Sequence, residues 1–271
     1  MTASEKTNEC WADPAALERL YRRYTRRTFV HPDPLEFLYA YEDPGNREVA
    51  GLVASALAFG GVKQILTSAG TVLERLGKPR ATLMDASRRD LERMFAGVTH
   101  RWADGSDVAA LLWGTWHVID RHGSLRACFE DALSPEHETV HPALCRFTGE
   151  LAEPKGCGYN SLLPCPPRGS ACKRLHLFLR WMVRRDRVDP GGWDGVPAAK
   201  LLMPMDVHMH RIARRLGMTD RASADLETAR EVTRGFRRLV PDDPVKYDFA
   251  LSRLGIRGDE DLDDVLPTLM L

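Results

Sequence analysis

The chain has 271 residues and a formal net charge of zero, with 38 basic and 38 acidic side chains. Its 44% hydrophobic and 28% charged residues are typical of a soluble protein that buries a full core, as one domain or two small lobes. No apolar run reaches the roughly 20 residues needed to cross a bilayer, and segment 1–8 is polar, unlike a secretory signal. We therefore expect a cytoplasmic protein that forms one unit over residues 1–271, without a membrane partner.

Helical spacing of apolar residues begins early in the chain. Asp13 and Asp43 each precede a proline, a pair that predicts an N-cap followed by the first helical turn. An Ala-, Leu- and Val-rich run predicts a buried helix over 48–59. A second helix is predicted over 62–76, and Gly77 ends it.

The middle of the chain continues in the same way. Ser106 or Asp107 opens a helix that Gly123 closes, and Ser124 caps the next one. A further helix is predicted over 142–151. Strand patterns, meaning alternating β-branched residues bounded by turns, are nearly absent. The chain is therefore predicted to be all-α.

Two irregular loops separate the later helices. Residues 153–169 are rich in Pro, Gly and Cys, and residues 186–198 lack periodicity. Ser170 is expected to cap the helix after the first loop, and Asp206 the helix after the second, which Gly217 ends. The predicted apolar stripe of the helix after Ser170 is Ala171, Leu175, Phe178 and Met182.

We expect neither a metal nor a cofactor. The cysteines form no Cys-x-x-Cys pair and are expected to be reduced thiols; they are Cys10, Cys128, Cys145, Cys157, Cys165 and Cys172. His208 and His210 lie two apart on a predicted helix, so they point away from each other and cannot chelate one ion. Trp181 and Trp193 flank the loop 186–198, where core packing is expected and base stacking is the alternative.

Basic residues gather between Arg168 and Arg215. Eleven Lys or Arg and four Asp give this segment a balance of +7, which leaves −7 on the rest of the chain. Such a local excess is the electrostatic footprint of a polyanion site, although a solvated arginine-rich surface has the same composition. On the helix that begins in this segment, Lys173, Arg180 and Arg184 are predicted to lie opposite the apolar stripe.

Lys173 and Asp206 each stand at the start of a predicted helix. An amine and a carboxylate in such positions are the two groups needed to break an N-glycosidic bond through an amine intermediate. Arg174, Arg180 and the helix dipole would favour the neutral, nucleophilic amine, and backbone N–H groups would keep Asp206 ionised. A solvated lysine and a plain N-cap are the alternatives.

One stretch resembles the catalytic motif of the helix-hairpin-helix DNA glycosylase superfamily. It reads Asp206-Val207-His208-Met209, followed by Arg211-Ile212-Ala213 and Arg215-Leu216-Gly217. The Asp-Val-His-Met form is similar to that of the 8-oxoguanine glycosylases. Lys173 matches by position the catalytic lysine of the bifunctional members. The resemblance covers residues 160–256, which carry the hairpin-like loop, the lysine-bearing helix and the aspartate-bearing helix.

The resemblance implies a glycosylase-like, all-α fold with two helical lobes around a cleft. It implies base-excision repair of damaged duplex DNA, with AP-lyase nicking through a Schiff base on Lys173, a charge-stabilising Asp206 and an oxidised purine as substrate. The four C-terminal cysteines of the iron–sulfur members are absent, so no cluster is expected. The residues expected to contact nucleic acid are Arg168, Gly169, Ser170, Arg174, Arg180, Arg184, His208, Arg211 and Arg215.

The loop before Lys173 departs from the glycosylase hairpin, which is normally Leu-Pro-Gly-Val-Gly. Here it is longer and proline-rich, with one glycine: Leu163-Pro164-Cys165-Pro166-Pro167-Arg168-Gly169. The whole chain also resembles an uncharacterised bacterial family that shares Gly-Ser-Ala-Cys-Lys-Arg and Asp-Val-His-Met and brings no activity with it. A catalytically inactive nucleic-acid-binding or scaffold protein on the same fold is therefore the alternative function. The oligomeric state stays open.

Overall fold

The computed structural model describes residues 12–152, 160–256 and 266–270, and most of them are helical. The α-helices are α1 (Pro14–Tyr24), α2 (Pro44–Ala56), α3 (Val62–Leu76), α4 (Pro79–Asp85), α5 (Arg88–Met94), α6 (Gly105–His122), α7 (Leu125–Ala132), α8 (His141–Ala152), α9 (Lys173–Val183), α10 (Val207–Arg215), α11 (Leu226–Leu239) and α12 (Asp248–Ile256). The prediction of an all-α protein is confirmed.

Short elements connect these helices. The 3₁₀ helices are η1 (Arg27–Phe29), η2 (Pro34–Ala40), η3 (Pro166–Arg168), η4 (Ala198–Lys200) and η5 (Leu266–Leu269). Within the described ranges, β-structure beyond isolated bridges is limited to an antiparallel hairpin of β1 (Thr99–His100) and β2 (Ala103–Asp104). None of the described helices is long and apolar enough to span a membrane.

Helix boundaries follow the local signals in the sequence. The Asp13 side chain accepts a hydrogen bond from the N–H of Ala15, and Asp43 caps α2 in the same way. Gly123 ends α6 in the left-handed conformation, with φ of 83°, and Ser124 caps α7. The cap of α6 is Asp104 rather than Ser106 or Asp107, because Asp104 forms a capping box with the residue three positions later.

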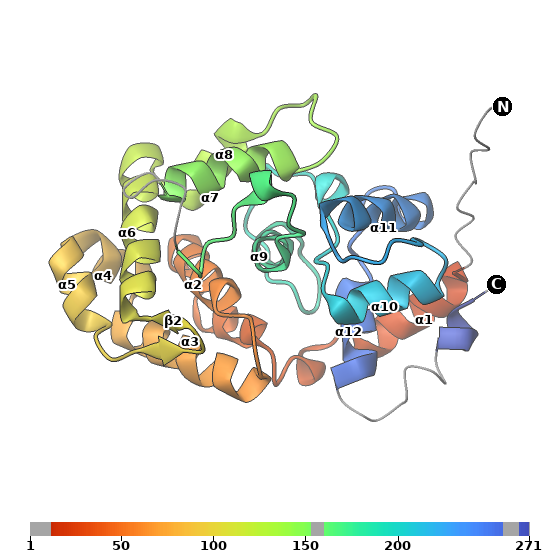
Figure 1. Ribbon diagram of the computed structural model, residues 1–271, viewed down its shortest axis with the longest axis horizontal. Helices are drawn as coiled ribbons and strands as arrows, with labels where there is room; N and C mark the ends of the chain where they lie inside the picture. Colours follow the sequence, from red (N-terminus) through yellow and green to blue (C-terminus); the bar gives the residue numbers. More distant parts are fainter. Residues whose placement is uncertain (1–11, 153–159, 257–265, 271) are drawn as a thin grey trace.

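Two hydrophobic cores make up the interior. The larger one is built mainly from α2, α3 and α6 to α9, and the smaller one from α1, α10, α11 and α12. Figure 1 shows the second group of helices on the right, with α9 seen end-on between the two groups. Helix α12 contributes to both cores, through Phe249 to the larger one and through Ala250 and Leu251 to the smaller one.

Helix α9 is buried around most of its circumference, which corrects one prediction. Leu175, Phe178 and Met182 are buried as predicted, but Arg180 and Arg184 are only 3% and 5% exposed. Their burial contradicts both the predicted contact of these two arginines with nucleic acid and the alternative of a solvated basic surface. The physical reason is that α9 is a central helix, packed on several sides, so no single stripe defines its buried face.

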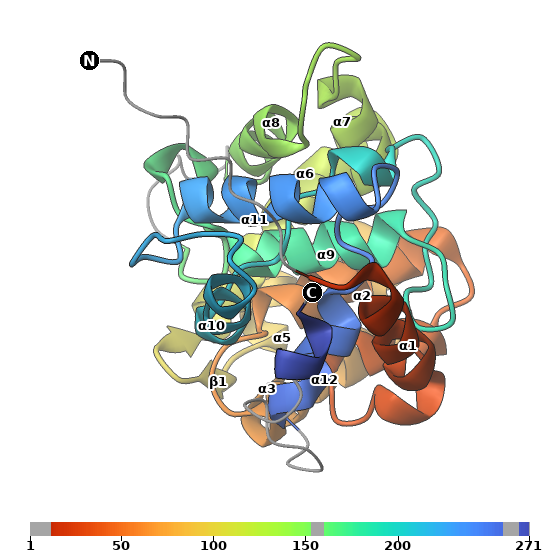
Figure 2. The same ribbon diagram turned by 90° about the vertical axis from the view of Figure 1, so that its right-hand side faces the viewer.

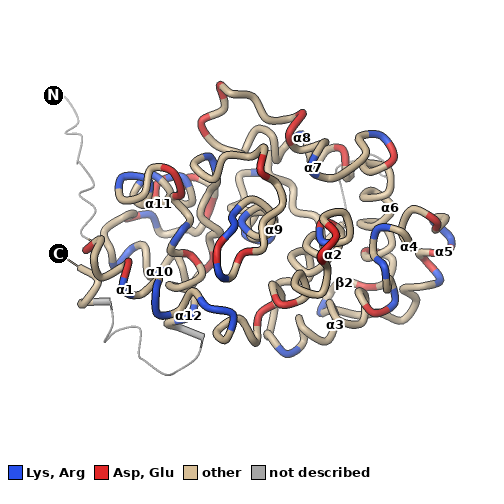
Figure 3. The backbone as a smooth tube through the Cα atoms, turned by 180° about the vertical axis from the view of Figure 1, so that it is seen from behind, with Lys and Arg blue, Asp and Glu red and all other residues tan. Residues whose placement is uncertain are grey.

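Four aspartates neutralise the two buried arginines. Arg180 pairs with Asp189 and Asp248, and Arg184 pairs with Asp186, Asp189 and Asp243; we call these six residues the buried ion cluster. Desolvation opposes the charged guanidiniums, but the carboxylates outweigh it and raise the pKa of both arginines. Figure 3 shows acidic and basic segments side by side at the C-terminal end of α9.

The loop 186–198 supplies part of this cluster and part of the core. Asp189 is fully buried, and so is Trp193, whose Nε1 donates to Glu48 at 2.9 Å. Trp181 is 1% exposed. Core packing of both tryptophans is confirmed, and base stacking by either is excluded because neither ring reaches the surface. The loop is irregular, as predicted, because its backbone wraps buried side chains instead of forming a periodic element.

Candidate active site

Lys173 and Asp206 lie together, as the sequence predicts. Lys173 is the first residue of α9, and Asp206 immediately precedes α10. The Nζ atom of Lys173 is 2.7 Å from Oδ2 of Asp206, and the two side chains are 36% and 35% exposed. The two helices belong to different cores, so the ion pair joins one core to the other at a position that solvent reaches.

Asp206 is both an N-cap and a partner of Lys173. Its Oδ1 accepts a hydrogen bond of 2.8 Å from the N–H of Met209, as the capping prediction requires. Burial raises the pKa of Asp206, but the charge and hydrogen bond of Lys173, the N–H of Met209 and the charge of His208 together hold the pKa below its ordinary value. Asp206 is therefore ionised at neutral pH and free to act through its second oxygen.

The backbone before α9 turns sharply to place Lys173. Cys172 is the N-cap of α9 in the left-handed region, with φ of 43°, and its side chain makes no capping hydrogen bond. Ser170 is not the cap, which corrects that prediction; its Oγ instead accepts from the N–H of Cys172 at 3.3 Å. Cys172 packs in the larger core and Ala171 in the smaller one, so adjacent buried side chains fix where the helix begins.

Arg174 is partly buried and donates to backbone carbonyls. Its guanidinium donates to the carbonyl oxygens of Ala56 and Ser161 at 2.6 and 2.8 Å and lies 4.8 Å from the ring centre of Phe59. Burial lowers the pKa of Arg174 to about 10. The backbone carbonyls of Ala56, at the end of α2, and of Ser161 thus take up donors of Arg174, and its contact with nucleic acid stays a prediction.

The predicted loop contacts Arg168, Gly169 and Ser170 are exposed. Gly169 adopts φ of 76° and its carbonyl accepts from the N–H of Leu226 at 3.1 Å, while Ser170 forms an isolated bridge with Asp225. The loop is thus docked on the start of α11. The three loop residues that were predicted to contact nucleic acid therefore lie on the surface, shortly before Lys173 in the chain.

The outer face of α10 carries the remaining predicted contacts. Arg211 and Arg215 are exposed, and His208 is partly exposed. Among the described residues, the buried Nε2 atom of His208 has no hydrogen-bond partner. His210 points elsewhere, since its Nε2 lies 2.9 Å from the carbonyl oxygen of Arg221. The structure therefore keeps His208, Arg211 and Arg215 on the surface of α10, the helix that Asp206 caps.

A residue that the sequence reasoning missed stands near the site. Trp102, at the tip of the β1–β2 hairpin, is 67% exposed and stacks on Phe59 with ring centres 4.9 Å apart. Because Arg174 covers Phe59, this hairpin is tied to the start of α9. Figure 2 shows the hairpin and α10 on the same side of the molecule, and in Figure 1 they lie to the left and to the right of α9. The signal in the sequence was an aromatic residue next to Arg101, in a turn just before a helix cap.

The chemistry available here is that of an amine and a carboxylate. In the described segments, no group of three His, Cys, Asp or Glu side chains is placed to hold a metal ion. The described cysteines, Cys128, Cys145, Cys165 and Cys172, form no disulfide with one another. Cys10 lies outside the described residues, and so do residues 153–159 of the loop 153–169, which include Cys157.

The comparisons with known proteins give one finding. Comparison with curated proteins and with solved structures gives no match. A family model described as "Protein of unknown function (DUF2400)" matches residues 33–257. The match includes Lys173, Asp206 and the Trp102 hairpin, and it covers most of the 271 residues. The chain therefore belongs to the DUF2400 family, whose function is unknown.

Proposed function

We propose that this protein is a bifunctional DNA glycosylase that removes a damaged base and then nicks the strand. The observation that carries the proposal is the 2.7 Å contact between Lys173 Nζ and Asp206 Oδ2 at the starts of two helices. The sequence resemblance to the helix-hairpin-helix glycosylases identifies the same two residues independently. In this proposal, the two helical cores correspond to the lobes of that fold, with the substrate cleft where they meet.

Asp206 is suited to prepare the amine. Transfer of a proton from Nζ to Oδ2 across 2.7 Å frees the lone pair of Lys173. Nζ then forms a bond to C1′ of the nucleotide while the C1′–N bond to the base breaks. The base leaves with the bonding electrons and takes up a proton, which Asp206 can return. Once its proton has passed to the departing base, Asp206 is ionised again and stabilises the positive charge on the sugar.

The covalent intermediate leads to strand cleavage. Opening of the sugar ring turns the amine adduct into a protonated Schiff base on Lys173. Loss of the proton at C2′ then expels the 3′ phosphate, which breaks the strand, and water releases the lysine. This sequence needs no oxidant, reductant or metal. It needs only that the amine and the carboxylate stay within reach of one carbon atom, as their 2.7 Å contact allows.

The surface around the pair suits a nucleotide turned out of a duplex. His208, Arg211 and Arg215 offer positive or hydrogen-bonding groups for phosphates on one side of Asp206, and Arg168, Gly169 and Ser170 do so beside Lys173. Trp102 offers an exposed ring for stacking on a neighbouring base. An oxidised purine is the proposed lesion, because the Asp-Val-His-Met form of the motif resembles that of the 8-oxoguanine glycosylases.

Borohydride trapping tests this proposal. A duplex containing 8-oxoguanine, and one containing an abasic site, are incubated with the protein and sodium borohydride, which reduces the Schiff base to a stable adduct. We expect an adduct with the wild type and with Lys78→Ala, a control at an exposed lysine on the cap of α4. The adduct should be absent with Lys173→Ala.

Two outcomes contradict the proposal. An adduct that survives in a folded Lys173→Ala variant moves the nucleophile elsewhere. The lack of any adduct with the folded wild type on both duplexes removes the lyase reaction, and retained binding to the same duplexes would then favour the non-catalytic nucleic-acid-binding protein.

A further inference from the structure

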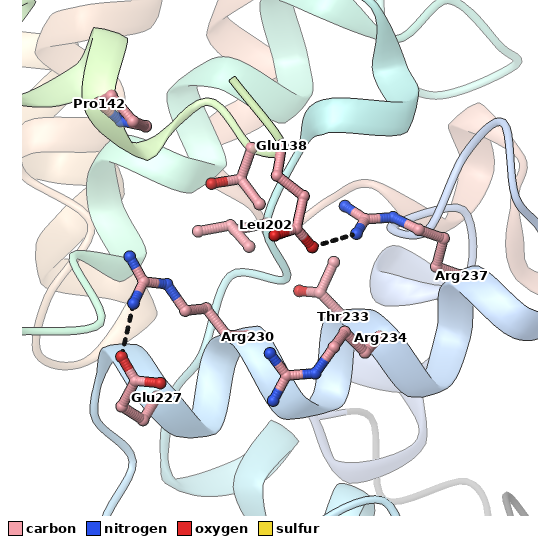
Figure 4. Close-up of a pocket in the computed structure, with 9 residues that line it drawn as sticks. Glu138, Pro142, Leu202, Glu227, Arg230, Thr233, Arg234 and Arg237 are labelled. Atoms are coloured by element: carbon pink, nitrogen blue, oxygen red, sulfur yellow. Dashed lines mark hydrogen bonds and ion pairs between the residues drawn. The ribbon is translucent and has the colours of Figure 1, made fainter. Parts of the chain in front are cut away.

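A cavity lies away from the Lys173–Asp206 pair. It has a volume of about 340 Å³ and is bounded by α11, by the start of α8 and by the segments that precede α8 and follow η4. None of its lining residues comes from α9 or α10. Figure 4 shows α11 along one wall, with Glu138 and Leu202 across from it. The volume falls at the lower end of the range of small-molecule sites.

Three arginines of α11 line one wall of this cavity. Arg230, Arg234 and Arg237 are spaced at i, i+4 and i+7, so they share one face of the helix. Arg230 pairs with Glu227 at 2.6 Å, and Arg237 pairs with Glu138 at 3.3 Å. These five side chains give the lining a formal charge of +3 − 2 = +1. In the described part of the chain, Arg234 has no carboxylate or carbonyl partner.

The two carboxylates do not close the site to an anion. Their side chains are 51% exposed for Glu227 and 75% exposed for Glu138. Ion pairs at that exposure contribute little to stability, because water competes for both charges. Arg230 and Arg237 can therefore exchange a rim carboxylate for a ligand with more charge and a better fit.

The floor of the cavity is apolar and its polar atoms are already paired. Leu202 is 1% exposed and Pro142 lies beside it. The hydroxyl of Thr233 donates to the carbonyl of Ala229 at 2.6 Å and accepts from the N–H of Met203 at 2.9 Å. The groups left to bind a ligand are the guanidiniums, with an apolar surface below them.

We propose that this cavity binds a phosphate monoester of a small molecule about the size of a nucleotide. A monoester carries close to two negative charges at neutral pH, enough to offset the positive lining. Its three terminal oxygens match the fork of donors that two guanidiniums one helical turn apart present. The apolar floor takes the organic part of the ligand. The site is independent of the proposed glycosylase activity.

Isothermal titration of the full chain with inorganic phosphate, adenosine 5′-monophosphate and adenosine tests the proposal. We expect both phosphates to bind, the monophosphate more tightly, and adenosine not to bind measurably. Arg234→Gln should weaken monophosphate binding at least ten-fold, and Arg234→Lys should weaken it less, because it keeps the charge but not the fork. Arg238→Gln makes the same charge change on the same helix outside the lining and should leave binding unchanged.

Three results would overturn the proposal. The first is no heat from either phosphate with folded wild type. The second is equal affinity in Arg234→Gln and Arg238→Gln. The third is that the monophosphate does not bind, whereas a single-stranded oligonucleotide without terminal phosphates does bind and Arg234→Gln weakens its binding. That result would assign the cavity to a phosphodiester backbone. Melting curves of each variant establish that it is folded, as expected for the exposed Arg234.

Discussion

Replacing Arg184 by methionine tests the buried ion cluster directly. The side chain of Arg184 is 4% exposed and pairs with Asp186, Asp189 and Asp243, so its removal leaves buried carboxylates with too little positive charge. Breaking a buried ion pair from one side costs about 3–5 kcal/mol. For a chain of this size we expect the melting temperature to fall by about 10 °C.

The neighbouring Arg185→Met is a matched control. Arg185 is 66% exposed and lies 3.7 Å from Asp194, which is 75% exposed, so this change should cost less than about 1 kcal/mol. Urea unfolding followed by circular dichroism measures both variants. Equal and small losses in the two would refute the burial of Arg184 and return it to the surface as a candidate phosphate contact.

The loss in Arg184→Met should also depend on pH. Burial raises the pKa of Asp189 to about 6 from an ordinary value of 3.8, even with both guanidiniums in place. A group whose pKa is raised on folding stabilises the fold below its unfolded value, and this contribution is lost as pH rises through the folded value. Without Arg184 the carboxylate takes up a proton more readily, so the destabilisation should be smaller at pH 5 than at pH 7.5. A loss that grows towards pH 5 would contradict this reasoning.

Three further predictions follow from other contacts. Gly114→Ala should destabilise the protein although alanine favours helix more than glycine, because the new methyl group would meet the carbonyl of Leu151. Gly149→Ala places its methyl group in open space and should raise the free energy of unfolding by about 0.5–1 kcal/mol, measured by urea unfolding. Asp206→Asn should keep the cap but slow base release by about 10²–10³. Because the folded pKa of Asp206 is lowered from 3.8, any stability that its charge contributes should be present above pH 3.8 and be lost as the pH falls through the lowered pKa. Trp102→Ala should weaken binding to lesion duplex about ten-fold in fluorescence anisotropy without lowering the melting temperature.

Local signals predicted the helices well because their causes are local. Asp43 caps α2 through a hydrogen bond to an N–H three residues later, and Gly123 ends α6 because it adopts a positive φ. The burial of Arg180 and Arg184 was missed for the opposite reason. Arg180 pairs with Asp248, 68 residues further along the chain, and a helical wheel cannot show that a second layer of protein covers the polar side of a helix.

The same difference between local and long-range causes decides which residues of the candidate site could be predicted. Lys173 and Asp206 were found because each begins a helix and the motif around Asp206 is contiguous. The partners of Arg174 could not be predicted because they are backbone carbonyls, which carry no pattern in the sequence. Trp102 was missed because its exposure and its link to the site depend on Phe59, in a different turn.

The buried ion cluster has a mechanical consequence for the molecule. Arg180 and Arg184 extend from the central helix to Asp248 and Asp243, which lie on and before α12. Both arginine side chains are only 4% exposed, so any hinge rotation of the two cores about α9 would leave buried guanidinium charges without their partners. Such a motion costs several kcal/mol per broken pair. The gap between Lys173 and Asp206 is thus set at folding rather than by closure on a ligand, and a substrate must change its own shape to reach the pair.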